Sequence, residues 1–372
     1  MQLVAMGAQD VYLTGNPQIT FFKVVYRRHT NFSKECIAQQ FSGNANFGSS
    51  VTCTLARNGD LVQEIYLRAK LTCTTNSGKW TANDVTNLVK TVEVEIGGQK
   101  IDKHYSQWLD IYNELFETSH DYRNVMSSVA ETDSSSSATC YIPLRFWFNR
   151  NPGLALPLIA LQYHEVKINM TLAAETNMQF LAVADGDTIT GSTVSADLLV
   201  NYLYLDTDER RRFAQVSHEY LIEQVQHTGP ESEKNVDMTF NHPVKALFWS
   251  GVAWDNVKLQ LNGHDRAAVQ GHDYYHLVQP YESGLGHSGE QMDSDRVWNT
   301  VTAGRSTNTT STVGMYSFCL KPAEHQPSGT CNFSRIDNAR LSVGTEGVLY
   351  LFAMNYNVLR IMSGMGGLAY SN

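Results

Sequence analysis

Apolar and polar side chains alternate with a period of two along most of the chain, as in β-strands that bury one face. The stretch 51–73 alternates on both sides of Asn58-Gly59, a pair that favours tight turns, and predicts a β-hairpin. The stretch 91–102 predicts a second hairpin around a Gly-Gly pair, and 164–173 predicts a strand with one buried face. Strands that recur between turn signals are typical of antiparallel sandwiches or barrels.

One segment departs from this period. In 106–120, Trp108, Ile111, Tyr112 and Leu115 follow the spacing of an amphipathic helix, so we predict one short helix near 106–117. A parallel α/β fold needs a helix between nearly every pair of strands, and no such series of helical patterns is present. The sequence therefore predicts an all-β protein with one short helical excursion.

Two pairs of segments suggest an internal duplication. Residues 92–102 resemble 257–267, and 161–172 resemble 332–343, in the same order and at similar offsets. Self-similarity of this kind is typical of duplicated domains. A chain of 372 residues is also long enough for two domains. We therefore predict two successive β-domains.

The charged segment 205–212, LDTDERRR, has two interpretations. Asp206 and Asp208 form an Asp-x-Asp pair, which can hold a divalent cation beneath a phosphate or a sugar nucleotide. Only Glu209 could add a neighbouring ligand, and the adjacent arginines would repel a cation and pair with the carboxylates. The interpretation that we favour is a salt-bridged connection or short helix between the domains, formed by Asp206, Asp208, Glu209, Arg210, Arg211 and Arg212.

Composition narrows the class of protein. With 42% hydrophobic and 17% charged residues the chain is globular, and its net charge of -9 argues against a general nucleic-acid coat. The N-terminal stretch lacks the pattern of a secretory signal, and no apolar run approaches the ~20 residues of a membrane span. Six cysteines without a C-x-x-C pair are expected to be buried, reduced thiols.

Other candidate chemistry is sparse. His264, Asp265, His272, Asp273 and His276 cluster in sequence and could bind a metal, but on a strand they lie too far apart, so polar loop and strand positions are the favoured interpretation. No nucleophile elbow, P-loop or dinucleotide fingerprint is present.

The segment 21–32 interleaves aromatic residues with Lys23, Arg27 and Arg28. Such a pattern can stack on single-stranded bases, lie on an anionic membrane or contact a partner, and it also suits an ordinary first strand. Four Asn-x-Ser/Thr sequons are present, at Asn31, Asn169, Asn308 and Asn332. Of these, Asn308 is the one expected to be clearly exposed, as a possible surface glycan site.

Five long blocks give the chain a family resemblance. They are 7–32, 96–105, 151–168, 327–342 and 355–370. These blocks resemble the major capsid proteins of large nucleocytoplasmic DNA viruses, most strongly those of the algal chlorella viruses, and they reach from near the first residue to near the last.

The resemblance implies a double jelly roll, that is, two consecutive eight-stranded antiparallel sandwiches. We expect an N-terminal arm at 1–24, a first jelly roll at 25–206, a linker at 207–218 and a second jelly roll at 219–372. The polar loops at 131–140 and 283–312 are then expected to face outward.

The resemblance also implies a structural virion protein without a cofactor or enzymatic activity. Three chains are expected to form a pseudo-hexagonal capsomer that tiles an icosahedral shell and is made and assembled in the host cytoplasm. Expected partners are neighbouring capsomers, minor capsid and vertex proteins and a nearby internal membrane, without sequence-specific nucleic-acid binding. Lys23, Arg27 and Arg28 are expected at the inner face. Alternatives are a paralogue at special shell positions, a glycan-binding module, or a metal-dependent sugar-transfer enzyme using Asp206 and Asp208.

Overall fold

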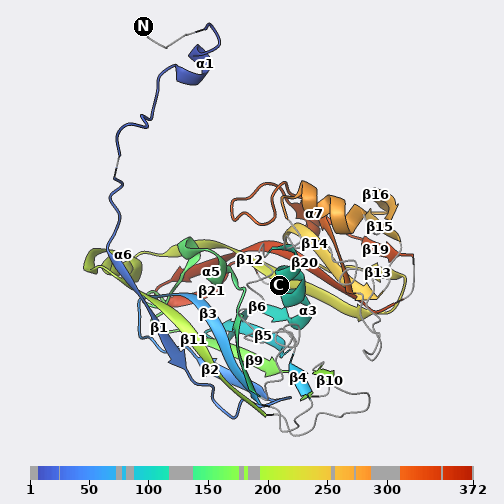
Figure 1. Cartoon of the computed structure of the whole chain (residues 1–372), viewed down its shortest axis with the longest axis horizontal. Coiled ribbons are helices and arrows are strands. Elements are labelled where there is room, and N and C mark those ends of the chain that lie inside the picture. Colours follow the sequence, from blue (N-terminus) through green and yellow to red (C-terminus); the bar gives the residue numbers. More distant parts are fainter. Residues whose placement is uncertain are drawn as a thin grey trace.

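The protein consists of two antiparallel β-sandwiches that lie side by side, with an N-terminal arm that extends away from them (Figure 1). The computed structural model describes residues 7–24, 26–72, 78–80, 88–116, 137–175, 180–182, 193–252, 256–271, 274–285, 311–344 and 347–370.

The first sandwich contains two four-stranded sheets. One has the order β1 (Phe32–Gln39), β11 (Thr193–Leu205), β3 (Leu61–Thr72) and β7 (Ser137–Pro143), with the short β8 (Leu156–Pro157) paired to β3. The other has the order β2 (Ser50–Thr54), β9 (Val166–Leu172), β5 (Val89–Ile96) and β6 (Gln99–Tyr105). The short strands β4 (Gly78–Trp80) and β10 (Phe180–Ala182) pair with each other apart from these sheets.

The second sandwich repeats this arrangement. One sheet has the order β12 (His218–Glu231), β20 (Leu349–Met362), β14 (Pro243–Val252) and β17 (Ser311–Ser317). The short β18 (Cys331–Asn332) pairs with β14, and β21 (Met365–Leu368) pairs with β20. The other sheet has the order β13 (Asn235–Asp237), β19 (Ala339–Val343), β15 (Asn256–Leu261) and β16 (His264–Gly271).

The two sandwiches therefore match strand by strand, and the predicted duplication is confirmed. The repeated segments occupy equivalent places, because 92–102 and 257–267 lie in the hairpins β5–β6 and β15–β16. Segments 161–172 and 332–343 likewise end in the equivalent strands β9 and β19. The eight main strands of each sandwich, four in each sheet, make the double jelly roll that the sequence predicted.

The predicted hairpin at 91–102 is confirmed. Gly97 and Gly98 have φ angles of 58° and 85°, and the turn pairs Ile96 with Gln99. Glycine adopts such positive φ values without the steric cost that a Cβ imposes. The strand predicted at 164–173 is also confirmed, since β9 buries alternate residues, namely Val166, Ile168, Met170 and Leu172.

The hairpin predicted at 51–73 is wrong. β2 pairs with β9 and β3 pairs with β11, so the two strands lie in opposite sheets of the sandwich. Alternation identifies each strand correctly, but it carries no information about which sheet the strand joins. Gly59 does not form a hairpin turn. It allows the backbone to pass close to Tyr202, because a Cβ at this position would lie 2.7 Å from Cβ of Tyr202.

We expect Gly59→Ala to destabilise the protein by roughly 1–3 kcal/mol, the usual range for overpacking a filled site. The added methyl group would also lie 3.3 Å from the carbonyl oxygen of Leu203. The backbone that connects β2 to β3 would therefore have to shift. Chemical denaturation measures the loss. Gly344→Ala is the matched control, since its Cβ would approach no atom closer than 3.4 Å. Equal stability of the two variants would contradict the close approach.

The helices lie mainly in connections between strands. The predicted helix is confirmed as α3 (Ser106–Leu115), and a second helix of similar length, α6 (Thr207–Gln215), joins β11 to β12. The remaining helical segments are short: α1 (Val11–Thr14), α5 (Trp147–Arg150), η1 (Pro152–Leu154), η3 (Tyr274–Val278), α7 (Gln279–Glu282) and η4 (Phe333–Arg335). None of the helices in the described ranges is long and apolar enough to span a membrane.

The cysteine prediction is wrong at one position. Cys53, Cys140 and Cys319 are buried free thiols and Cys331 is half-buried, but Cys36 is exposed. It lies on β1, which forms one edge of its sheet and has few buried side chains. Cys73 lies outside the described residues.

Candidate assembly surfaces

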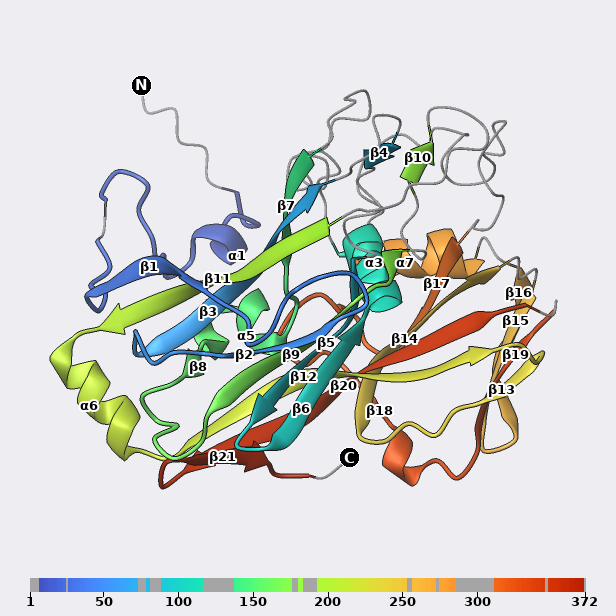
Figure 2. The ribbon, with the colours of Figure 1, turned by 90° about the horizontal axis from the view of Figure 1, so that it is seen from below.

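Helix α3 joins the two sandwiches. It follows β6 of the first sandwich, yet its buried face packs on β14 and β20 of the second (Figure 2). The Trp108 ring centroid lies 5.4 Å from that of Phe248 and 5.7 Å from that of Phe352. Because Trp108, Ile111 and Leu115 are almost completely buried there, this contact is a hydrophobic core shared by the two sandwiches.

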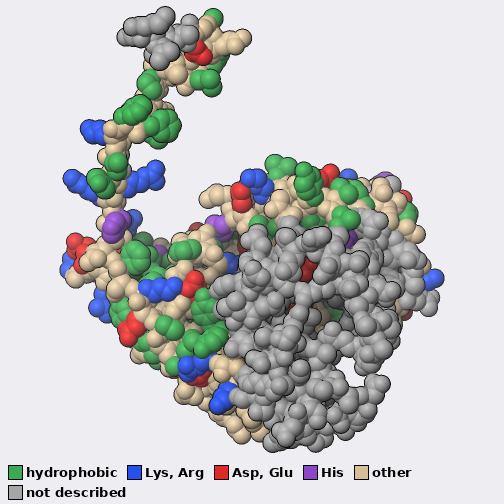
Figure 3. All heavy atoms as spheres, in the orientation of Figure 1, with side chains coloured by type: hydrophobic (Ala, Val, Ile, Leu, Met, Phe, Trp, Pro, Cys, Tyr) green, Lys and Arg blue, Asp and Glu red, His purple; other side chains and the backbone are tan. Residues whose placement is uncertain are grey.

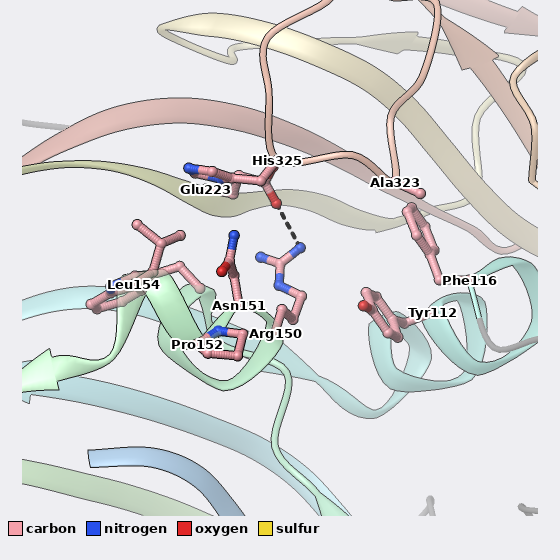
Figure 4. Close-up of a pocket in the computed structure, with 10 residues that line it drawn as sticks. Tyr112, Phe116, Arg150, Asn151, Pro152, Leu154, Glu223, Ala323 and His325 are labelled. Carbon is pink, nitrogen blue, oxygen red and sulfur yellow. Dashed lines mark ion pairs between the residues drawn. The ribbon is translucent and has the colours of Figure 1, made fainter. Parts of the chain in front are cut away.

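A charged cluster lies beside this core. Glu223 on β12 accepts from two cations. Arg150 Nη1 lies 2.8 Å from its Oε2 (Figure 4), and Lys245 Nζ lies 2.6 Å from its Oε1. The Lys245 side chain is only 1% exposed, and its Nζ also donates to the carbonyl oxygen of Glu324 at 3.1 Å. Arg150 comes from α5 of the first sandwich, so this pair ties the sandwiches together electrostatically.

The surroundings of Arg150 favour its charged form. Burial, the largest single effect, lowers the pKa of Arg150, but the nearby Glu223, Tyr112 and Asp102 together outweigh burial and the pKa is raised. Burial raises the pKa of Tyr356, whose ring lies 5.1 Å from Lys245 Nζ. Two cations thus share one carboxylate in a poorly solvated place, where losing that carboxylate is costly.

A small cavity of about 210 Å³ opens next to this cluster (Figure 4). Tyr112 of α3 and Phe116, which follows the end of this helix, form one wall with rings stacked at 4.7 Å, and Arg150 and Glu223 line the cavity with His325. Its walls therefore come from both sandwiches. In the part of the chain that is described, no three His, Cys, Asp or Glu side chains gather as a metal site would require.

The contact between β6 and β12 is polar and buried. Asp102 Oδ1 accepts from the backbone N–H of Val225 at 3.1 Å, and Gln224 donates to the carbonyl oxygen of Ile101. His104 Nε2 lies 2.9 Å from Asp102 Oδ2, and its ring stacks on Phe146 at 4.6 Å. These directed contacts fix how the sandwiches are oriented, in addition to the apolar contact of α3.

His227 gives the interface a pH dependence. Burial, with the charge of Lys103 as a smaller cause, lowers its pKa below the usual 6.5, and its ring stacks between Tyr105 at 4.4 Å and Phe352 at 4.7 Å. The unfolded chain therefore takes up this proton first as pH falls. Stability from His227 is complete above its ordinary pKa and is lost as pH falls toward the lower folded value.

We expect His227→Phe to weaken the dependence of stability on pH as pH falls below about 6.5, the ordinary pKa of histidine. Phenylalanine keeps the aromatic stacking and removes the titrating group. Denaturation midpoints measured across this range give the slope for each protein. An unchanged slope would show that His227 titrates alike in the folded and unfolded states.

The charged segment 205–212 forms the start of α6. Asp206 caps the helix, with its Oδ1 accepting from the N–H of Thr207 at 2.8 Å. Arg210 Nε lies 2.9 Å from Oδ1 of the buried Asp60, which also accepts from the N–H of Leu205. Asp208 and Glu209 lie in the first turn, and Arg212 in the last, where their charges complement the helix dipole. Arg211 lies on the same helix.

The histidine-rich segment is divided between different structures. Asp265 on β16 pairs with Lys258 at 3.0 Å and accepts from Gln260 at 2.7 Å, and these contacts lower its pKa. His276 is buried in η3, with Nδ1 2.7 Å from the carbonyl oxygen of Val313. His264 begins β16, whereas His272 and Asp273 lie outside the described residues.

The sequons differ in their surroundings. Asn169 is half-buried and donates to Glu93 and Glu95, and the Asn332 side chain accepts from the N–H of Ser334 at the start of η4. Asn31 beside β1 and Asn332 are both exposed, so the prediction that Asn308 is the one exposed sequon is wrong. Asn308 lies outside the described residues, as do most of the predicted outward loops at 131–140 and 283–312.

The N-terminal arm extends from the first sandwich (Figure 1). β1 begins at Phe32, so the stretch before it forms no strand in the described residues, and the first-strand interpretation is wrong. Phe21 and Phe22 are 92% and 99% exposed, and the basic Lys23, Arg27 and Arg28 are also exposed. In Figure 3, hydrophobic and basic side chains follow one another along this arm. Such a run of bare apolar side chains marks an interaction segment.

Sequence reasoning missed the charged cluster. The one signal was Lys245, which stands in the otherwise apolar run 243–249 of a central strand, where lysine is rare unless it is paired. Glu223 and Arg150 give no comparable signal, because their contact depends on how two distant segments meet.

Comparison with known protein families gives two matches that together cover most of the chain. Residues 20–206 match the family described as "Major capsid protein N-terminus". Residues 209–255 and 291–367 match the family described as "Large eukaryotic DNA virus major capsid protein".

Individual relatives agree with these families. The chain is 53% identical to the major capsid protein of Pyramimonas orientalis virus and 42% identical to that of Paramecium bursaria Chlorella virus 1, covering 100% of this chain and 99% of each relative. Among solved structures, Chlorella virus VP54 fitted into a reconstruction of the virophage Sputnik superposes with a TM-score of 0.81 at 38% identity, over 95% of this chain and 100% of that one. The Faustovirus major capsid protein shares the fold at 12% identity, with a TM-score of 0.68 over 96% of this chain and 94% of that one.

Proposed function

The chain belongs to the large eukaryotic DNA virus major capsid protein family, and from this premise we propose that three copies associate into a pseudo-hexagonal capsomer that tiles an icosahedral shell. It is a structural protein of the virion capsid, and we assign it no catalytic activity and no cofactor. Neighbouring capsomers are its main partners in the shell.

One observation carries the proposal: two sandwiches with the same strand order lie in one chain. Three such chains provide six similar bodies, which can occupy the corners of a hexagon although the true symmetry is threefold. Closed cyclic symmetry is the usual arrangement of identical chains, and hexagonal outlines pack densely on a surface.

We propose that α6 is the joint between the two jelly rolls. Asp206, Asp208, Glu209 and the three arginines that follow then have a connecting role, which the helix cap and the Arg210–Asp60 pair support. The limits at 206 and 219 follow from this proposal to within one residue, since β12 begins at His218, whereas the predicted start of the first jelly roll at 25 is too early because β1 begins at Phe32.

We propose that the arm contacts the inner face of the shell. Its exposed aromatic side chains and the basic Lys23, Arg27 and Arg28 suit a minor capsid protein or the surface of an internal membrane. The net charge of -9 gives no support for a nucleic-acid coat, so sequence-specific binding to the genome is not part of the proposal. Assembly in the host cytoplasm, with vertex proteins joining the shell, completes it.

The mass of the purified protein in solution tests the capsomer. Light scattering on a sizing column is expected to give a species near three times the chain mass of 41.6 kDa that persists on dilution. Electron microscopy of that peak should then show a six-lobed outline. A stable monomer at micromolar concentration would overturn the trimer.

Substitutions in the arm distinguish a role of the arm in particle assembly from a role in trimer formation. We expect Lys23→Ala, Arg27→Ala and Arg28→Ala together to leave the trimer mass unchanged and to reduce incorporation into particles by about tenfold, the effect of losing roughly 1.4 kcal/mol of contact. Co-expression followed by particle purification gives the readout. Lys321→Ala, which removes an exposed cation from the body, is the control. Normal incorporation of the arm variant would contradict the assignment.

A further inference from the structure

The internal duplication indicates which surfaces meet between copies. β3 and β14 are equivalent strands, and each pairs at its start with a short strand. β8 pairs with β3 from Leu61, and β18 pairs with β14 from Pro243. Counting five residues onward from each of these points makes Tyr66 on β3 equivalent to Phe248 on β14. The partners agree: Tyr66 pairs with Leu199 and Phe248 pairs with Phe352 at equivalent positions of the two sheets.

In the second sandwich, the surface around Phe248 and Phe352 is covered by another part of the same chain. Phe248 and Phe352 lie on the outer face of the sheet, away from the core of their own sandwich, and α3 of the first sandwich packs on them through Trp108. A helix that follows the sixth strand of one sandwich thus covers the outer face of the other.

In the first sandwich the equivalent face is more open. Tyr66 and Leu199 are half-buried, and Cys36 and Ala38 beside them on β1 are exposed. The face also carries the ion pairs Lys34–Glu64 and Arg68–Asp197. A mixed apolar and charged surface is typical of interfaces between subunits that fold separately, whereas the face beneath α3 is apolar.

The second sandwich has a helical segment equivalent to α3. η3 and α7 follow β16 as α3 follows β6, and η3 packs on its own sandwich through His276, next to Val313 of β17, and Tyr275, next to Trp249 of β14. Their other side is bare: Leu277, Val278 and Tyr281 are 36%, 40% and 85% exposed. These three residues are defined here as the α7 patch.

We infer that the α7 patch of one copy packs on the outer face of β1, β11 and β3 in the next copy, as α3 packs on β14 and β20 within the chain. The inference rests on the proposed trimer and names its contact surfaces. β1 and α7 lie well apart in both views of the molecule, so one chain cannot make this contact with itself (Figures 1 and 2). The contact is head-to-tail, and three repeats close it into a ring.

Photo-crosslinking tests the inference. The photoreactive p-benzoyl-phenylalanine is placed at Tyr281, where it preserves an aromatic ring, and the sample is irradiated at a concentration where light scattering shows its oligomeric state. We expect covalent dimers and trimers on a denaturing gel, with mass spectrometry placing the crosslinks in β1, β3 or β11. The same group at Tyr163, which is 76% exposed, is the control and is expected to give no crosslink to these strands.

The exposed thiol of Cys36 gives a second readout on the unsubstituted protein. Maleimide labelling of Cys36 in the trimer is expected to be at least tenfold slower than labelling of a free cysteine in a short peptide, because the patch covers β1, although Cys36 is exposed in the single chain. A trimer whose Cys36 labels at the rate of the peptide, or whose crosslinks map elsewhere, overturns the inference and leaves the capsomer intact. A monomer at every concentration overturns both.

Discussion

Glu223→Gln is expected to lower the free energy of unfolding by roughly 3–5 kcal/mol, the range measured when one partner of a buried ion pair is removed. The substitution keeps the size of the side chain but leaves Lys245 and Arg150 without their shared negative charge. Lys245 cannot turn to solvent, because its side chain is 1% exposed in a central strand. Denaturant unfolding followed by tryptophan fluorescence measures the loss.

Glu219→Gln is the matched control for this prediction. Glu219 lies on the same strand, four residues away, and pairs with Arg360 at 2.8 Å, but both side chains are at least half exposed. Exposed pairs contribute about 0–1 kcal/mol, so this variant should unfold almost as the original protein does. Similar losses in the two variants would mean that the Glu223 cluster is solvated in solution.

Trp108→Ala is expected to cost roughly 3–5 kcal/mol, since it removes a large ring from a filled core. The loss falls on the contact between sandwiches, because the ring lies against Phe248 and Phe352 and not in either sandwich's own core. We therefore expect the variant to unfold in two resolved calorimetric transitions, one for each sandwich. In the original protein the two sandwiches are expected to unfold more nearly together.

The control for this substitution is Leu320→Ala, which truncates a side chain that is 75% exposed. Surface truncations of this kind usually change stability by less than about 0.5 kcal/mol. A Trp108 variant that loses stability but still unfolds in one transition would show that the polar contacts of Asp102 and Glu223 couple the sandwiches without α3.

The fold could be predicted from sequence wherever the pattern is local. Alternation in 91–102 identified β5, β6 and their turn, and the spacing of Trp108, Ile111 and Leu115 identified α3. The pattern failed at 51–73, because the choice between a hairpin and a crossing to the opposite sheet depends on distant strands. Cys36 was misplaced for the same reason, since an edge strand has the same local pattern as a central one.

The interface between the sandwiches could not be predicted in the same way. Each member of the Arg150–Glu223–Lys245 cluster comes from a different segment, and only the folded chain brings the three together. The spacing of residues in α3 predicts an apolar face, but it does not predict which surface of the protein that face packs on. Sequence identifies which residues need a partner, whereas the partner follows from tertiary structure.

The covalent connection through α6 has a consequence for the concentration at which shells can form. In the proposed capsomer, the equilibrium concentration of assemblies made from six separate sandwiches would rise with the sixth power of the free concentration, whereas three linked pairs give only a third-power dependence. Each linked sandwich also meets its partner in the same chain at an effective concentration on the order of millimolar. Separate sandwiches would have to be synthesised to that concentration before they met as often. Joining the two sandwiches in one chain would therefore allow the proposed capsomers to form from fewer accumulated chains.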